Sequence, residues 1–168
     1  MELWDLYDRN RNKLDKVAKR GDKLADSEYH LVVNAWIMNS KGEFLISQRV
    51  PTKPHPLMWE CTGGSALKGE DSLKAAFREV KEELGIDVSK NERKFIGFSS
   101  RYYVGCPDIL DVWLFKKDVP IEEVVKQDEE VNDVMWASKD KIKELYENGQ
   151  FEATCFFEDI IYNGEDKQ

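Results

Sequence analysis

Three glutamates near the middle of the chain are spaced in a way that suits metal binding. Glu79, Glu82 and Glu83 are separated by steps of three and four residues, so they share one face if the segment is helical. Like charges at this spacing destabilise a bare helix, and a cation bound between them would remove that cost. Carboxylate oxygens are hard ligands that suit magnesium or manganese. A solvated acidic helix face is the common alternative, and the three glutamates alone do not decide between the two.

The residues around the glutamates favour the metal site. Two glycines, Gly63 and Gly64, precede them, and Arg78 stands directly before Glu79. The positions that form a pattern are Gly64, Glu70, Arg78, Glu79, Val80, Glu82, Glu83, Gly85 and Ile86. These nine positions across 23 residues are similar to the Nudix box at every defined place, which is a strong signal for a short motif. The chain therefore resembles the Nudix hydrolase superfamily.

The resemblance implies a role for each polar residue of the box. Glu82 and Glu83 would hold the metal, which is Mg²⁺ or, as a second possibility, Mn²⁺. Glu79 would hold a second metal or orient the attacking water, and in some relatives this residue is the base. Arg78 has a planar guanidinium that can hold neighbouring carboxylates in place.

Two further positions of the segment have implied roles. The backbone carbonyl of Gly63 is expected to point at the metal, and glycine at 63 and 64 lets the backbone approach a ligand closely. Glu70 resembles the first glutamate of the box, which assists either the metal or the arginine. Beyond the box, two pairs are secondary candidates: Arg49 and Lys53 as phosphate contacts, and Glu129 and Glu130 as acidic groups that assist catalysis. Surface charge and an acidic turn are the alternatives for these pairs.

The reaction implied by the resemblance is attack of water on a phosphorus atom of a substituted diphosphate. A bound metal would screen the phosphate charges, lower the pKa of the water and stabilise the departing oxygen. We therefore predict a metal-dependent hydrolase that cleaves the pyrophosphate linkage of a nucleoside diphosphate derivative or a nucleotide. The loops outside the box set specificity, so the base, the sugar and the bond remain open.

Two alternatives stay beside the hydrolase. The resemblance to a Nudix domain extends from about Tyr29 to Trp136, and the segments 3–8 and 20–22 resemble a subgroup related to type I isopentenyl diphosphate isomerases. Those isomerases need a cysteine and a histidine where this chain has Gly63 and Ser65, and Cys61 is two residues away. They usually have a degraded box, whereas this box is intact, so the isomerase comes second. A catalytically silent nucleotide-binding Nudix module comes third, because loss of catalysis normally shows as loss of the carboxylates.

The elements that must position these residues follow from periodicity and turn residues. Asp71–Leu84 is predicted to be a helix, capped by Asp71 or Ser72 and ended by Gly85. Predicted strands are Leu3–Tyr7, Lys16–Lys19, Tyr29–Met38, Glu43–Val50, Trp59–Thr62 (ended by the two glycines), Phe95–Tyr103, Ile109–Phe115 and Val131–Trp136. Lys139–Asn148, capped by Ser138, and Thr154–Tyr162 are predicted helices. Most of the aromatic residues Phe98, Tyr102, Tyr103 and Trp113 are expected to fill the core.

The order of these elements predicts an α+β fold, and the resemblance implies an α/β/α sandwich around a mixed sheet. We expect a single Nudix domain over residues 1–168, with an N-terminal strand extension (1–28), a Nudix core (29–137) and C-terminal helices (138–168).

Composition limits the partners and the cellular location. The formal net charge of −8 argues against a nucleic-acid-binding surface, but not against a phosphate substrate, because a bound cation inverts the sign of an acidic site. The apolar runs are too short to span a bilayer and no signal peptide is visible, so a cytoplasmic protein without membrane contact is expected. The three cysteines form no metal-binding pair. A small-molecule diphosphate is the expected partner of a monomer or homodimer.

Overall fold

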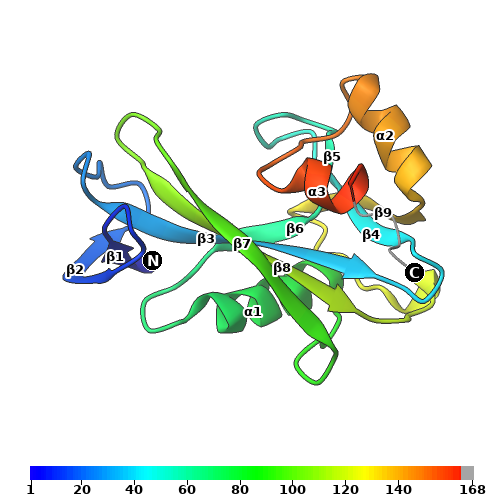
Figure 1. Ribbon diagram of the computed structural model, residues 1–168, viewed down its shortest axis with the longest axis horizontal. Coiled ribbons are helices and arrows are strands. Elements are labelled where there is room, and N and C mark those ends of the chain that lie inside the picture. Colours follow the sequence, from blue (N-terminus) through cyan, green and yellow to red (C-terminus); the bar gives the residue numbers. More distant parts are fainter. Residues whose placement is uncertain (164–168) are drawn as a thin grey trace.

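The longest strand, β3 (Tyr29–Met38), organises the whole sheet in the computed structural model, which describes residues 1–163 (Figure 1). Along one edge it pairs in parallel with β8 (Asp108–Lys116). Along the other edge it pairs antiparallel with β1 (Leu3–Tyr7), β6 (Thr62–Ser65) and β4 (Phe44–Arg49). The outer strands are β2 (Lys13–Lys19) on β1, β7 (Arg93–Arg101) on β8, and both β5 (Trp59–Glu60) and β9 (Val131–Ala137) on β4. The parallel pairing of β3 with β8 among antiparallel neighbours makes the sheet mixed.

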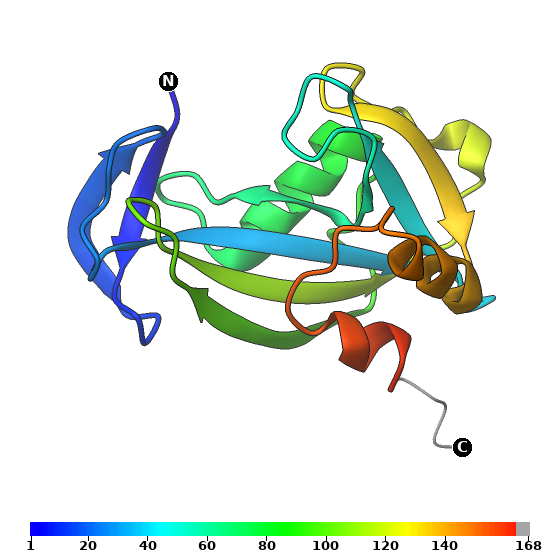
Figure 2. The same cartoon turned by 90° about the horizontal axis from the view of Figure 1, so that it is seen from above.

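Helices cover both faces of this sheet because β3 and β8 are apolar on both faces. Successive side chains of a strand point to opposite faces, so Leu31 and Val33 pack against α1 (Ser72–Leu84) while Trp36 packs toward α2 (Lys139–Glu147) and α3 (Phe157–Ile161). Figures 1 and 2 show α1 on one side of the sheet and α3 on the other. The predicted α+β fold, an α/β/α sandwich around a mixed sheet, is confirmed.

Helix α1 begins and ends at the predicted signals. The Asp71 side chain accepts a hydrogen bond of 2.8 Å from the Lys74 backbone N–H, and Gly85 takes the left-handed conformation that ends the helix. Val80 and Leu84 are fully buried against the sheet. The helix therefore has one face fixed in the core, which orients the polar residues on its other sides.

The β1–β2 hairpin is attached to the loop that leads into α1. The Lys68 N–H donates to the Leu3 carbonyl at 2.7 Å, and the Gly69 N–H donates to Asp5 Oδ2 at 2.7 Å. Asp5 is buried and also pairs with Lys13 at 2.9 Å. Burial alone raises the pKa of Asp5, but the hydrogen bonds from Gly69 and Lys13 outweigh it and the pKa lies below its ordinary value. The N-terminal extension is thus held beside the box segment.

The predicted strand Trp59–Thr62, ended by two glycines, is wrong in its bounds. Two strands, β5 and β6, separate at Cys61, and Gly63 and Gly64 lie inside β6, opposite Asn34 and Val33 of β3. A Cβ atom at Gly63 would come within 2.3 Å of the Val33 carbonyl oxygen. Glycine at position 63 therefore allows β6 to lie close to β3, and it does not mark the end of a strand.

Two other predictions need correction, and one short element was not predicted. The helix predicted over Thr154–Tyr162 is only Phe157–Ile161, because Phe156 has a left-handed backbone (φ 64°). The side chains of Phe98, Tyr102 and Tyr103 are about half exposed instead of buried, since they lie on the edge strand β7 and the loop after it. A 3₁₀ turn, Ile121–Glu123, was not predicted. The remaining elements match with end shifts of at most three residues, and part of the predicted region 138–168 lies outside the described residues.

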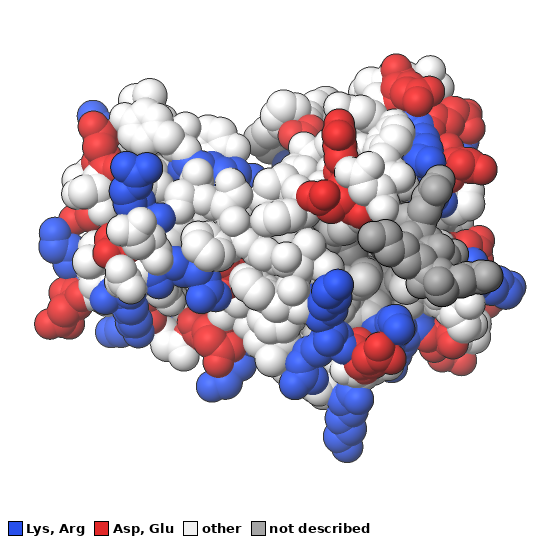
Figure 3. All heavy atoms as spheres, viewed as in Figure 1, with Lys and Arg blue, Asp and Glu red and all other residues white. Residues whose placement is uncertain are grey.

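The described part of the chain contains no helix that is both long and apolar enough to cross a membrane. On the face drawn in Figure 3, basic side chains lie scattered among acidic ones rather than in one continuous patch. The molecule therefore presents a mixed charge pattern on this face.

Candidate active site

The box residues line a cavity of about 230 Å³ beside α1 and β6. One wall comes from the β1–β2 hairpin and another from the loop between β4 and β5. The lining residues are Glu2, Arg20, Val32, Lys53, Gly63, Gly64, Ser65, Arg78, Glu79, Glu82, Glu83, Gln127 and Glu130. Seven of the ten candidate site residues are therefore brought together here, together with the box residue Gly64, while Arg49, Glu70 and Glu129 do not line the cavity.

Arg78 is the centre of the polar contacts in this site. Its Nε and Nη2 donate to the two carboxylate oxygens of Glu70 at 2.8 and 3.0 Å, and Nη2 also donates to the Ser65 carbonyl at 2.9 Å. Its Nη1 donates to Glu79 at 2.9 Å and to Glu82 at 3.1 Å. An arginine has five N–H donors, and all five are used. Arg78 therefore positions the glutamates and has no donor left for a substrate.

Glu79 lies against the backbone of β6. A Cβ atom at Gly64 would come within 2.3 Å of Glu79 Oε1, so only glycine leaves room for this carboxylate. Burial raises the pKa of Glu79 to about 6; Arg78 opposes this shift and Glu82 adds to it. The carboxylate is thus held in a confined position between Gly64 and Arg78.

Replacing Gly64 by alanine is expected to reduce activity about 100-fold with little change in fold. The added methyl group would force Glu79 out of its place beside Arg78, and a displacement of about 1 Å at a catalytic group can cost this much. Steady-state kinetics on any hydrolysed substrate, together with thermal unfolding, would measure both effects. Unchanged turnover in a folded variant would show that the position of Glu79 is not important.

Glu83 is the most enclosed of the three glutamates. Its residue is only 8% exposed, and within residues 1–163 its carboxylate has no hydrogen bond or ion pair. Burial raises the pKa of Glu83 well above its ordinary value, and the nearby carboxylates of Glu79 and Glu60 raise it further. The sequence predicted that the three glutamates share one polar face. In the structure they differ in exposure, because Glu83 is buried whereas 53% of the Glu82 side chain is exposed.

The pKa of Glu79 gives a prediction for the metal-free protein. Because the pKa is about 6 in the folded state and near 4.5 when unfolded, the folded state holds this proton more tightly. The stability from this proton is fully present below pH 4.5 and is lost as the pH rises through 6, an effect of about 2 kcal/mol. Urea unfolding in EDTA across pH 4.5–8 would measure it. Glu79→Gln is expected to flatten the decline, and an identical pH dependence in both proteins would contradict the prediction.

A divalent cation fits the chemistry of this site. Glu79, which is partly buried, and Glu83, which is buried, place hard oxygen donors beside each other. Burial raises the pKa of each carboxyl, and repulsion from neighbouring carboxylates adds to the shift. A cation would offset that repulsion. As they stand, however, no three Asp, Glu, His or Cys side chains within residues 1–163 form a group that could hold one ion, and Arg78 holds Glu79 and Glu82. The metal-binding role of these residues therefore remains a prediction.

The secondary candidates divide between the cavity and its surroundings. Lys53 lines the cavity and forms an ion pair with Glu130, which lines it too. Arg49 lies outside, where it donates to Glu60 at 2.9 Å and to the Pro54 carbonyl at 2.7 Å. Glu70 acts through Arg78. The predicted substrate contacts are therefore both in ion pairs, and only Lys53 faces the cavity.

Cys61 does not belong to this cavity. It is 7% exposed and lies in the apolar cluster on the α2 and α3 side of the sheet. Burial raises the pKa of its thiol well above the ordinary value. This environment suits a structural thiol that packs in the core.

Several residues of the site were not selected from the sequence. Glu2, Arg20 and Gln127 line the cavity, and Glu60 adds to the raised pKa of Glu83. Arg20 was noticed only as part of a subgroup pattern. No local motif marks these positions, because strand pairing and loop packing bring them to the box from distant parts of the chain.

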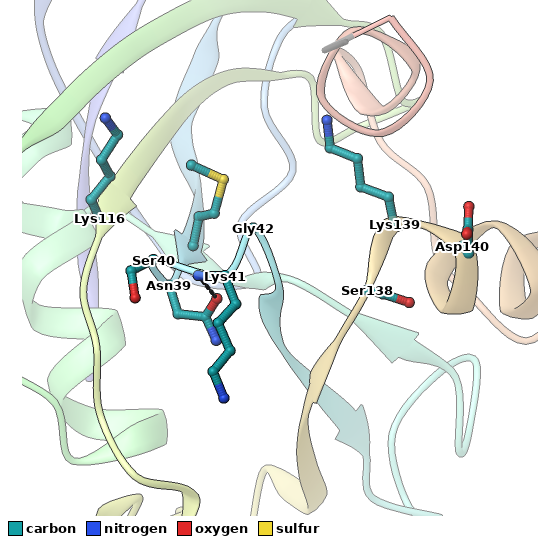
Figure 4. Close-up of a pocket in the computed structure, with 9 residues that line it drawn as sticks. Asn39, Ser40, Lys41, Gly42, Lys116, Ser138, Lys139 and Asp140 are labelled. Atoms are coloured by element: carbon teal, nitrogen blue, oxygen red, sulfur yellow. Dashed lines mark hydrogen bonds between the residues drawn. The ribbon is translucent and has the colours of Figure 1, made fainter. Parts of the chain in front are cut away.

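A larger cavity, about 560 Å³, lies away from the glutamates. Its walls are the turn Asn39–Gly42, the end of β8 at Lys116 and the start of α2 at Ser138. Figure 4 shows Lys116 and Lys139 on opposite sides of it. It contains none of the box residues, so cavity size alone does not indicate the active site.

Comparison with known proteins gives the family. The NUDIX domain family matches residues 28–158 of this chain. The chain belongs to the Nudix family. An uncharacterized Nudix hydrolase of Listeria innocua is 44% identical over 165 residues, which cover 96% of this chain and 94% of that protein. The prediction of a Nudix hydrolase is confirmed at this level.

Two other similarities define how far the Nudix comparison reaches. A crystal structure of a Deinococcus radiodurans protein has a TM-score of 0.76 at 20% identity, covering 96% of this chain and 99% of that one, which shows the fold. The isopentenyl-diphosphate Delta-isomerase of Escherichia coli is 32% identical over only 79 residues, covering 46% of this chain and 43% of the isomerase. The similarity to the isomerase is thus partial, whereas the similarity to the Nudix hydrolase spans nearly the whole chain.

Proposed function

We propose that this Nudix protein hydrolyses the pyrophosphate linkage of a nucleoside diphosphate derivative or nucleotide by attack of water on phosphorus. The observation that carries the proposal is the arrangement around Arg78, whose five donors hold Glu70, Glu79 and Glu82 beside a cavity. A solvated helix face would not need such an arrangement. The buried carboxylate of Glu83, which has no hydrogen bond or ion pair within the described residues 1–163, adds a group that a cation would stabilise.

Glu79, Glu82, Glu83 and the Gly63 carbonyl would hold Mg²⁺ or Mn²⁺. Such an ion, when bound, screens phosphate charge and lowers the pKa of water. The chain itself holds the groups in place. Helix α1 fixes the glutamates, and glycine at position 64 leaves room for the Glu79 carboxylate beside the backbone of β6. The side chain of Lys53 places a positive charge at the wall formed by the loop between β4 and β5. Glu130 stays paired with Lys53 and keeps it at the cavity.

The isomerase alternative is disfavoured by the positions of three residues. Gly63 and Ser65 occupy the places where the isomerases need their cysteine and histidine, and neither side chain can do that acid–base chemistry. Cys61 is buried outside the cavity. Ancestry related to the isomerases rests on the partial similarity alone.

A substrate panel tests the proposed function. Phosphate and nucleotide release would be measured from nucleoside diphosphate derivatives and nucleotides, with Mg²⁺, with Mn²⁺ and with EDTA. Isopentenyl diphosphate would be assayed separately for conversion to dimethylallyl diphosphate. Metal-dependent hydrolysis of any of the nucleotides supports the proposal. Isomerisation without any hydrolysis would show that the alternative is correct, and silence in both assays would favour a binding module.

A further inference from the structure

A second cationic side chain reaches the catalytic cavity from outside the Nudix box. Arg20, at the end of the β1–β2 hairpin, lines the cavity together with Glu2 from the opposite strand of the same hairpin. Arg20 Nη1 donates to Glu2 Oε2 at 2.8 Å, and the Arg20 backbone N–H donates to the Glu2 carbonyl at 3.0 Å. Glu2 and Glu79 line the same cavity, and the charge of Glu2 adds to the raised pKa of Glu79.

The hairpin is held at this place by contacts with the box segment. The Leu3 carbonyl, next to Glu2, accepts the Lys68 N–H, and Asp5 accepts the Gly69 N–H, so the loop before α1 is bonded to β1. Figure 1 shows the hairpin at the end of the sheet where this loop turns into α1. Arg20 therefore lies at the cavity rim because of contacts that fix the backbone, while its side chain remains 65% exposed.

The three cations that line the cavity differ in what they can still bind. Arg78 has used all five of its donors. Lys53 is in a close ion pair with Glu130 and is 26% exposed. Within residues 1–163, the Arg20 guanidinium has a single partner, one oxygen of Glu2, so most of its planar set of donors is available. Such a guanidinium can bind a phosphoryl group through two parallel hydrogen bonds.

We propose that Arg20 binds a phosphoryl group of the diphosphate substrate and that Glu2 holds the same guanidinium until the substrate displaces it. The inference rests on the proposed function, because it assigns a binding role within the same site. Glu2 would act as a competitor of weak affinity, since an ion pair between two exposed side chains adds little net stability. The N-terminal extension would then be part of the substrate site rather than an addition to the fold.

Binding of methylenediphosphonate, a diphosphate that cannot be hydrolysed and carries no nucleoside, tests Arg20 directly. Isothermal titration calorimetry at fixed Mg²⁺ would compare the full-length protein with Arg20→Ala and Arg20→Lys. We expect Arg20→Ala to raise the Kd about tenfold, which corresponds to about 1.4 kcal/mol, and Arg20→Lys to raise it less. Arg9→Ala is the matched control, since Arg9 is exposed in the turn of the same hairpin and does not line the cavity.

A double substitution separates direct competition by Glu2 from its long-range charge. Glu2→Gln is expected to lower the Kd about two- to fivefold, because Arg20 is then free. In the Arg20→Ala background the same substitution should lower the Kd by clearly less, because only the long-range charge of Glu2 is then removed. If Glu2→Gln tightens binding equally in both backgrounds, its effect is that of net charge, and the pairing with Arg20 is not the cause.

The outcomes distinguish this inference from the proposed function. If wild-type protein fails to bind the probe, or binds it no better than Arg20→Ala, the assignment of Arg20 is overturned, whatever the hydrolysis panel shows. If the probe binds through Arg20 but no nucleotide is hydrolysed, the assignment stands and the proposed hydrolysis fails.

Discussion

Replacing Glu82 by glutamine is expected to lower turnover about 100- to 1,000-fold while the fold is retained. Glutamine has nearly the same size, and its oxygen can still accept the 3.1 Å hydrogen bond from Arg78. The charge needed to hold a divalent cation would be lost, and removal of one group that stabilises charge in a transition state has an effect of this size. Because more than half of the side chain is exposed, little packing changes. Initial rates across a range of Mg²⁺ concentrations would measure the loss.

The control for Glu82→Gln is Glu144→Gln on helix α2. Glu144 is an exposed helical glutamate that faces Lys141 at 3.5 Å, far from the box, so the same chemical change should leave turnover unaltered. The thermal unfolding midpoint should stay near that of the wild type for both variants. Full activity of Glu82→Gln would refute a metal-binding role for this residue.

Replacing Arg78 by alanine is expected to have the largest combined effect on stability and activity. The substitution leaves Glu70, Glu79 and Glu82 without the donor that they share, and the carboxylates of Glu70 and Glu79 are largely buried. Removing one partner of a buried ion pair typically costs about 3–5 kcal/mol because the other charge stays uncompensated. We expect an unfolding free energy lower by about 3 kcal/mol and turnover lower by at least about 100-fold. Urea unfolding and steady-state kinetics would measure the two.

Arg78→Lys separates charge from geometry. Lysine keeps the positive charge but cannot make the planar set of five hydrogen bonds, so it should recover part of the stability and little of the activity. Arg93→Ala is the control. This exposed arginine on β7 donates to the Ser89 carbonyl and lies 5.6 Å from the centre of the Phe77 ring, so its loss should leave turnover unaltered and lower the unfolding free energy by no more than about 1 kcal/mol. An unfolding free energy of Arg78→Ala within about 1 kcal/mol of the wild type would show that the contacts of Arg78 are not important for stability.

The sequence alone determined the helix that contains the Nudix-box glutamates and the identity of its polar residues. Asp71 and Gly85 mark the two ends of α1 by local hydrogen bonding and backbone conformation, and the apolar spacing fixes the buried face that contains Val80 and Leu84. These signals act within a few residues of the chain, which is why they can be read without the fold. The run Tyr29–Met38, rich in valine, isoleucine and aromatic residues, likewise predicted the strand β3 with the bounds that the structure has.

The tertiary structure alone decided how the three glutamates differ. Their helical spacing gives a shared face, but the packing of α1 against the sheet encloses Glu83 and leaves Glu82 open. The role of Gly64 is also tertiary, since the atom it must avoid belongs to Glu79, fifteen positions further along the sequence. Even the bounds of β6 follow from its pairing with β3, which overrides the preference of glycine for turns.

The residues that reach the cavity from distant parts of the chain could not be predicted from sequence patterns. Arg20 and Glu2 reach the cavity because Leu3 and Asp5 bond to the loop before α1, and Lys53 reaches it through a loop fixed by Arg49. None of these contacts has a spacing rule, because each joins segments separated by an arbitrary length of chain. The box can therefore be identified from sequence, whereas the other walls of the cavity beside it exist only in the folded protein.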